Sequence, residues 1–332
     1  MHIPALRIAV QTLSVLAFTA TSALAAEAYK VPRLADGKPD LQGVWTNASA
    51  TPFERPSKFG TRRAYTKEEA DAIEKEERGK VAADAAPTKP DEKQEAGALP
   101  PVGNYNLFWT DRGMTAAFID GEYRTSVIIE PADGRIPALK QRERRGRQMA
   151  ERPTSSADGP EQRGLGERCI LSFGSSGGPP MLPTMYNSYY QIVQSSDHVM
   201  ILVEMVHDAR IIRMGGKHGD GKVRQWMGDS IGHWEDDTLV VETIHFRPEQ
   251  SFRGSSPDMV VTERFTRVAK DMIKYRFTIN DPTAFAAPFT GELPFTGVPD
   301  SVYEYACHEG NYALPGIMAA EREREKSEVG KK

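Results

Sequence analysis

The feature of this sequence that most constrains its fold is a run of short segments, from residue 186 onward, in which apolar and polar residues alternate. The segments are YNSYYQIVQ, HVMILVEMV, ARIIRM, KVRQWMG, DTLVVETIHF, MVVTERFTRV, MIKYRFTIN and SVYEYACHE. Alternation with a period of two is typical of half-buried β-strands, and short turns such as residues 235–237 and 269–271 separate the segments. The run therefore predicts an antiparallel meander over residues 186–310 that closes into a barrel or a sandwich.

A second feature, the sequence Gly43-Val44-Trp45, favours the barrel. This G-x-W resembles the signature of lipocalins and other calycins, in which the Trp side chain closes the floor of the barrel. Together with the later meander, the resemblance implies a mainly β chain: an antiparallel, lipocalin-like β-barrel with an N-terminal extension of loops and helices. We expect Gly43–Thr46 to join the same sheet as the meander.

The N-terminal part of the chain predicts little regular structure. A capping-box pattern at Thr66-Lys67-Glu68-Glu69 predicts a surface helix, and YRTSVIIE at 123–130 predicts a strand. Residues 82–101 are low-complexity, and 133–152 are typical of a turn and a basic helix with a solvated face. The regions we expect are a signal peptide at 1–26, an extension at 27–160 with two helices and the first barrel strand, the barrel at 161–318 and a charged tail at 319–332.

The first 26 residues have the pattern of a secretory signal peptide. Arg7 precedes an apolar run from Ile8 to Phe18, and Ala23-Leu24-Ala25 provides an A-x-A cleavage site. We expect cleavage near Ala25 or Ala26 and a periplasmic or secreted protein; a buried N-terminal helix is the alternative. The apolar run is shorter than the roughly 20 residues that span a bilayer, so we expect no integral membrane segment.

The two cysteines, Cys169 and Cys307, flank the strand-rich region. In an oxidising compartment they are the natural partners of a disulfide, which closes a long loop and stabilises the fold. Two free buried thiols or a nucleophile are the alternatives. Redox catalysis is not favoured, because the sequence contains no C-x-x-C pair.

Composition and missing motifs exclude several classes of function. The formal net charge is −4 with charges of both signs well mixed, so no basic stripe indicates a nucleic-acid partner. The sequence contains no H-E-x-x-H, paired-cysteine zinc motif, EF-hand loop, nucleophile elbow or dinucleotide fingerprint. We therefore expect no metal and no cofactor.

The segment VEMVHDARIIR, residues 203–213, is the main candidate site. As one continuous strand it would place Glu204, Asp208 and Arg210 on one face and His207 on the other. All four reach one cavity only if a β-bulge at His207-Asp208 re-aims a side chain, which is the reading we favour. The alternatives are a structural His207, or outward charges in weak cross-strand ion pairs.

Other residues complete the predicted site. Glu242 and Glu263 lie in mid-strand beside apolar neighbours, where a carboxylate needs a cation such as Arg210 or Arg264. CHEGNY at 307–312 forms a turn that the disulfide would hold rigid. We expect catalytic roles for Glu204, His207, Asp208 and His308, and substrate contacts from Arg210, Trp226, Trp234, Glu242, Tyr190, Tyr275, Tyr305 and Asn311. Trp226 and Trp234 as core residues, and His308 and Asn311 as partners of backbone groups, are the alternatives.

These residues favour acid–base chemistry without a cofactor. Two groups with different pKa values in a water-poor cavity suit a lyase or isomerase that dehydrates, decarboxylates or eliminates. The expected partner is a small hydrophobic or aromatic molecule. A periplasmic carrier for such a molecule is the alternative, and a structural or interaction protein is a third class.

Several longer phrases carry a further resemblance. They are ADGKPDLQGVW, NSYYQIVQ, EMVHDARII, RQWMGDSIGHWEDDTLVVET, FRGS, ERFTRV and YEYACHEGNY. Through them, nearly all of the expected mature chain resembles a family of exported bacterial proteins of unassigned activity. This resemblance implies export but no reaction, so it adds nothing to the chemistry inferred from the residues.

Overall fold

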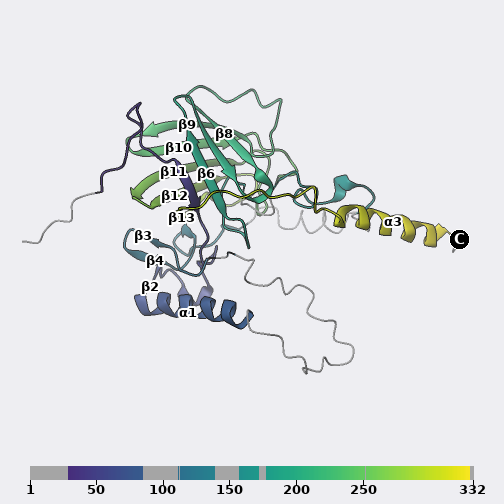
Figure 1. The fold of residues 1–332 in the computed structure, drawn as a ribbon, viewed down its shortest axis with the longest axis horizontal. Helices are drawn as coiled ribbons and strands as arrows, with labels where there is room; N and C mark the ends of the chain where they lie inside the picture. The colour runs from purple at the N-terminus through teal and green to yellow at the C-terminus, as the bar shows by residue number, and fades with distance from the viewer. Residues whose placement is uncertain are drawn as a thin grey trace, which may run out of the picture. The chain divides into compact units, whose positions relative to one another are not determined.

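Nine strands, β1 and β6 to β13, close into a barrel in the computed structural model (Figure 1). Closure comes from β13, which pairs with β12 on one side and with β1 on the other, where Trp45 lies opposite Gly297. The prediction of a mainly β chain with a barrel that recruits the G-x-W segment is confirmed. The strands are β1 Gly43–Thr46, β6 Tyr189–Gln194, β7 His198–Val203, β8 Ala209–Met214, β9 Asp229–Glu235, β10 Thr238–Ile244, β11 Val260–Ala269, β12 Met272–Asn280 and β13 Phe289–Val298.

The structure describes residues 29–84, 111, 113–138, 157–171, 177–250 and 252–329. The barrel belongs to the unit formed by residues 31–332. The predicted signal peptide, most of the low-complexity stretch and most of the predicted basic helix lie outside the described residues. Among the described helices, none has both the length and the apolarity needed to cross a bilayer.

One pair of neighbouring strands, β8 and β9, is parallel, whereas the other pairs in the barrel are antiparallel. Strand directions cannot alternate all the way around a closed ring with an odd number of strands, so nine strands require such a pair. A parallel pair needs a long crossover connection, and residues 215–228 provide it. The prediction that KVRQWMG is a strand is wrong, because this segment belongs to the crossover.

The last strand of the barrel, β13, was not predicted. Gly291 and Pro294 interrupt its sequence pattern, and both residues are depleted in strands. Gly291 is required by packing, because a Cβ atom there would lie 2.4 Å from Cζ of Phe277. Conversely, SVYEYACHE, predicted to be the last strand, forms an irregular segment and a turn. The sequence pattern therefore missed β13, because Gly291 is required by the packing of Phe277 on the neighbouring strand and not by a local signal.

The N-terminal extension carries a helix and a small sheet. Helix α1, Lys67–Asp84, begins at the predicted capping box: the Glu69 N–H donates to Thr66 Oγ1 at 3.2 Å, and the Thr66 N–H donates to Glu69 Oε2 at 2.8 Å. The predicted strand at 123–130 is divided, since its two halves pair in different sheets. The remaining elements are β2 Ala64–Tyr65, β3 Phe118–Ile119, β4 Glu122–Arg124, β5 Ile128–Glu130, which pairs with β13, the 3₁₀ turns Ser57–Phe59 and Pro160–Gln162, and helix α3 Ala313–Val329.

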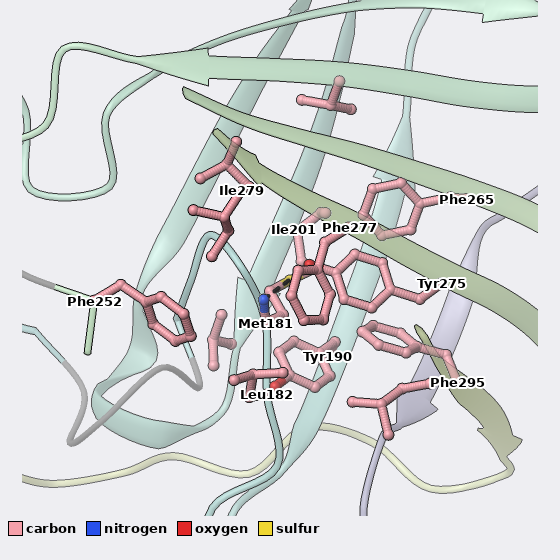
Figure 2. Close-up of a cluster of buried hydrophobic side chains, with 14 of the residues drawn as sticks. Met181, Leu182, Tyr190, Ile201, Phe252, Phe265, Tyr275, Phe277, Ile279 and Phe295 are labelled. Carbon is pink, nitrogen blue, oxygen red and sulfur yellow. Dashed lines mark hydrogen bonds between the residues drawn. The ribbon is translucent and has the colours of Figure 1, made fainter. Parts of the chain in front are cut away.

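The inside of the barrel is packed with aromatic side chains. On β12, the predicted inward face of Ile273, Tyr275, Phe277 and Ile279 is buried as expected, and Met259, Val261, Glu263 and Phe265 form the inward face at β11. Figure 2 shows Met181 and Leu182, from the chain that precedes β6, among these rings. Burial of each such side chain contributes about 1.5–3 kcal/mol, so this cluster dominates the stability of the barrel.

Candidate functional site

The predicted strand at 203–213 is a hairpin. Strand β7 ends at Val203, a 3₁₀ turn spans Met205–His207, and β8 begins at Ala209. The Val203 N–H donates to the Asp208 carbonyl oxygen at 2.8 Å and closes the hairpin. The prediction of one continuous strand with a bulge is therefore wrong. Met205 and Val206 belong to a buried turn, and these two apolar residues made the turn resemble part of a strand in the sequence.

The turn has an unusual backbone. Val206 has φ of 61° and His207 has φ of 45°, both in the left-handed region. A β-branched residue rarely occupies this region, and such a conformation costs about 1–3 kcal/mol. Val206 is buried in the core cluster, so its packing helps to offset that cost. Backbone strain of this kind is often found at functional sites, so this turn is a candidate functional site.

The polar residues of the turn hold the segment that follows the barrel. Glu204 is 4% exposed; its Oε1 accepts a hydrogen bond from Asn187 Nδ2 at 2.6 Å, and its Oε2 accepts one from the Tyr303 N–H at 2.9 Å. The exposed His207 donates from Nδ1 to the Tyr305 carbonyl oxygen at 3.1 Å. Both carboxylate oxygens of Glu204 are engaged, whereas the second nitrogen of His207 remains available for acid–base chemistry.

Arg210 lies apart from this turn site, inside the barrel. Its guanidinium is 2% exposed and forms a bidentate ion pair with Glu263, with Nη1 at 3.0 Å from Oε1. Arg210 Nε donates to Ser230 Oγ at 3.1 Å, and Nη2 donates to Thr243 Oγ1 at 2.9 Å. The expected cation partner for a buried carboxylate is present, but the guanidinium is occupied by Glu263. Arg264, the other candidate, is on the outer face and pairs with Glu235.

Two predicted substrate contacts, Tyr190 and Tyr275, hold a piece of the chain inside the barrel instead. The Met181 N–H donates to the Tyr275 hydroxyl at 2.9 Å (Figure 2). That hydroxyl donates to Glu263 Oε1 at 2.8 Å. Asn47 Nδ2 donates to the Met181 carbonyl oxygen and to the Tyr190 hydroxyl. Burial raises the pKa of both tyrosines, and the charge of Glu263 adds to the effect at Tyr275. Both hydroxyls remain neutral and act as structural hydrogen-bonding groups.

Three other predicted contact residues lie elsewhere. Glu242 is exposed on the outer face of β10, where its Oε1 is 3.2 Å from His218 Nε2. The guanidinium of Arg247 lies over the ring of Trp226 at 4.1 Å from its centroid. Trp234 packs against the core and lines a pocket of about 190 Å³ at β9. The structure therefore does not bring these side chains together with Glu204.

A larger pocket lies beside the segment that Glu204 and His207 hold; we call it the rim pocket. It has a volume of about 530 Å³. One wall is the Cys169–Cys307 disulfide, which confirms the predicted pairing; its Cα atoms are 5.8 Å apart. The lining residues are Gly166, Glu167, Cys169, Tyr186, Glu304, Tyr305, Ala306, Cys307, Gly310, Asn311, Ala313, Leu314 and Ile317.

The rim pocket contains two residues that the sequence predicted and several that it did not. Tyr305 and Asn311 line it, whereas the side chain of His308 is exposed and is not among the lining residues. Asn311 Nδ2 donates to the Glu167 carbonyl oxygen at 2.7 Å, so the turn is tied to the segment of Cys169 by more than the disulfide. The apolar contribution of α3 was missed, because the charged sequence after residue 318 suggested only a tail.

A polar cluster on the outer wall was also missed. Asp229 Oδ1 accepts from Arg213 Nη2 at 2.6 Å, and its Oδ2 accepts from the Gly219 N–H at 2.8 Å and lies 3.3 Å from His218 Nδ1. Burial acts to raise the pKa of Asp229, but the hydrogen bonds from Gly219 and Arg213 outweigh it and hold this pKa below its usual value. The cluster fastens the crossover connection to the barrel wall.

Candidate metal ligands are few. Within the described parts of the chain, Asp158, Glu321 and Glu325 are the one group of three or more His, Cys, Asp or Glu residues whose ligand atoms lie close enough together to share an ion. Glu321 is already paired with Arg324. Acidic groups of this kind are common on protein surfaces without a metal, so they do not define a site.

Comparison with family models, with curated proteins and with solved structures finds no match for this chain. The functional conclusion therefore depends on the geometry of the rim pocket and on the residues around it.

Proposed function

We propose that this protein binds a small, largely apolar molecule in the rim pocket. The observation that carries the proposal is a pocket of about 530 Å³ whose walls are mostly apolar. Leu314 and Ile317 of α3, Tyr186, Tyr305 and the disulfide cysteines are all among its lining residues. Pockets for small molecules occupy about 300–1,000 Å³ and combine apolar walls with a few polar groups, as this one does.

The barrel fold is compatible with a cavity for a hydrophobic ligand, but the rim is the better location. Around Tyr190 and Tyr275 the interior is filled by Met181 and Leu182 of the chain itself. A ligand there would have to displace the backbone bonds of Met181. The rim pocket needs no such displacement, and its walls are cross-linked, so little order has to be created on binding.

An exported binding or carrier protein is the role that fits this site. The sequence begins with the pattern of a signal peptide, and a disulfide is compatible with an oxidising compartment outside the cytosol. The resemblance to exported bacterial proteins supports export and does not bear on what the protein binds.

Binding of Nile red, an uncharged apolar dye, tests the proposal. We expect saturable binding to the native chain, and an affinity that falls about tenfold in Ala313→Trp, because the indole fills a pocket of this size. Ala320→Trp is the matched control, since Ala320 is exposed on the same helix and does not line the pocket. Equal affinities in the two variants, or no saturable binding to the native chain, would contradict the proposal.

A cofactor-free lyase or isomerase is a second candidate, and the geometry of His207 is the observation that favours it. Because a carbonyl oxygen can only accept, Nδ1 carries the proton in the contact with Tyr305, and Nε2 makes no hydrogen bond with a described residue. His207 itself and the preceding residue, Val206, have the strained left-handed backbone. In this candidate, His207 abstracts a proton from a substrate held beside Tyr305.

Nuclear magnetic resonance of mixtures of small aromatic acids and alcohols separates the two candidates. An enzyme consumes at least one of them, and His207→Asn abolishes consumption while Nile red binding persists. Asn is chosen because it tolerates the left-handed backbone at this position. A native chain that binds the dye but consumes nothing supports the carrier and eliminates the enzyme.

A further inference from the structure

Among the described residues that line the rim pocket, the charged side chains are of one sign. These residues include Glu167 and Glu304 but no Lys, Arg or His. Arg168 lies between two lining residues in the sequence and is not itself part of the lining. A pocket of this composition presents a negative potential to its ligand, which favours a positive charge on the molecule that enters.

The two carboxylates differ in how far they are already satisfied. Glu167 accepts a hydrogen bond from the Gly164 N–H at 2.8 Å and forms an ion pair with Arg163. Glu304 is exposed and makes no hydrogen bond or ion pair with any described residue. Its carboxylate is thus the charge at the pocket that lacks an internal counter-ion.

The other polar group at the wall also presents an acceptor. Both hydrogens of the Asn311 amide are directed at the protein, one at the Glu167 carbonyl oxygen at 2.7 Å and one at Cys169 Sγ at 3.6 Å. An amide has two donors and one carbonyl oxygen, so the oxygen of Asn311 is left to accept. A ligand that donates hydrogen bonds matches this group as well as Glu304.

The described lining of the pocket also includes two tyrosines. Tyr186 and Tyr305 line the pocket, while Tyr303 and Tyr312, next to lining residues in the sequence, are 69% and 83% exposed. Faces of tyrosine rings attract organic cations, and the attraction adds to that of a carboxylate. An anionic or purely hydrocarbon ligand would use neither feature.

We infer that the rim pocket selects organic cations: molecules with an apolar body and a protonated amine, whose amine is held by Glu304 and the Asn311 carbonyl oxygen. The inference rests on the proposed binding function and names the ligand class for it. The apolar body lies against Leu314, Ile317 and the disulfide, and the amine faces the open side near residue 304.

Calorimetric titration of the full, oxidised chain at pH 7 with three probes of one shape tests the inference. The probes are 4-phenylbutylamine, 4-phenylbutanol and 4-phenylbutyrate, which share a phenyl ring on a four-carbon chain and end in an ammonium, a hydroxyl and a carboxylate group. We expect the amine to bind about fivefold more tightly than the alcohol, the combined effect of a partly exposed ion pair and a cation–π contact. The carboxylate should bind more weakly than the alcohol.

Glu304→Gln should lower the affinity for the amine toward that for the alcohol, leaving only the cation–π part of the preference, and should leave the affinity for the alcohol unchanged. Glu309→Gln is the matched control, because Glu309 is an exposed carboxylate in the same segment that does not line the pocket. Equal binding of amine and alcohol, or tighter binding of the carboxylate, overturns the inference and leaves the proposed function intact. Failure of all three probes while Nile red binds has the same meaning, whereas failure of Nile red as well overturns both.

Discussion

The barrel interior and the rim pocket both contain carboxylates, and they treat these groups in opposite ways. Inside the barrel, Glu263 is fully buried and receives hydrogen bonds from the Arg210 guanidinium and the Tyr275 hydroxyl. At the rim, Glu304 is exposed and has no hydrogen-bond or ion-pair partner among the residues that the structure describes. A buried charge is tolerated only when paired, whereas water solvates an exposed one at no cost. The charge that the fold leaves unpaired is the charge available to a ligand.

The hairpin turn at 204–208 lies between these two cases. Glu204 is buried like Glu263, but its partners, Asn187 and the Tyr303 N–H, are neutral. Its carboxylate is used to hold the segment that forms one wall of the rim pocket. A group predicted to perform chemistry is thus better explained as a group that shapes the site.

The largest expected effect comes from removing the disulfide. The Cys169→Ser/Cys307→Ser double variant opens a crosslink across 138 residues, which in the chain-entropy model lowers the free energy of unfolding by about 5 kcal/mol. Urea denaturation measures this change. Dye binding should be lost even where the barrel remains folded, because one wall of the rim pocket is gone. Unchanged dye affinity in the folded variant would show that the rim pocket does not depend on the disulfide.

Breaking the buried ion pair is expected to have the next largest effect. Glu263→Ala leaves the Arg210 charge buried without a counter-ion, so we expect a loss of about 3–5 kcal/mol in urea denaturation. The Arg210→Met/Glu263→Leu double variant should recover most of this loss, since no charge remains. If the double variant is as unstable as the single one, packing rather than charge dominates the barrel interior.

A smaller effect is expected at Asp229, on the outer wall. Asp229→Asn should cost about 1–2 kcal/mol at pH 7, because the hydrogen bonds from Arg213 and Gly219 favour the ionised carboxylate. Its pKa is lower in the folded chain than the usual value of 3.8, so this contribution is present above pH 3.8 and is lost as the pH falls through the folded pKa. Unfolding of native chain and variant should therefore converge in acid. A difference that persists at pH 2 would contradict the assignment.

The smallest expected effect on stability is that of Glu304→Gln. An exposed carboxylate without an internal partner contributes within about 0.5 kcal/mol, so urea denaturation should hardly change while amine binding falls. This variant tests the comparison directly, because its effect on binding should exceed its effect on folding. For Glu263→Ala the reverse order is expected. A large loss of stability in Glu304→Gln would show that this charge has a structural role.

The sequence predicted those elements whose cause is local. Ile273, Tyr275, Phe277 and Ile279 alternate along one strand, and the barrel buries that face as expected. The capping box at Thr66 and Glu69 begins α1. The chain has two cysteines, so each could form an intramolecular disulfide only with the other. In each case the pattern that carries the information is contained within a few residues or follows from a count.

Elements with a non-local cause were missed or misread. Met205 and Val206 are apolar because they cover the core from a turn, and no local signal separates such a turn from a strand. Gly291 interrupts β13 because the Phe277 ring occupies the space of its Cβ atom. These residues are explained by contacts with neighbours that are brought close only in the folded chain.

The sequence by itself determined that this chain is mainly β, because the alternation of apolar and polar residues is a local property, and it favoured a barrel and a Cys169–Cys307 disulfide, which the structure contains. Only the tertiary structure decided the parallel pair β8–β9, the pairing of Arg210 with Glu263 and the location of the rim pocket. The pocket joins residues near 167, 186, 305 and 314, which no spacing relates. A site made from three separate stretches of the chain exists only after long-range packing has placed their backbones together, and no one stretch contains the information for that placement.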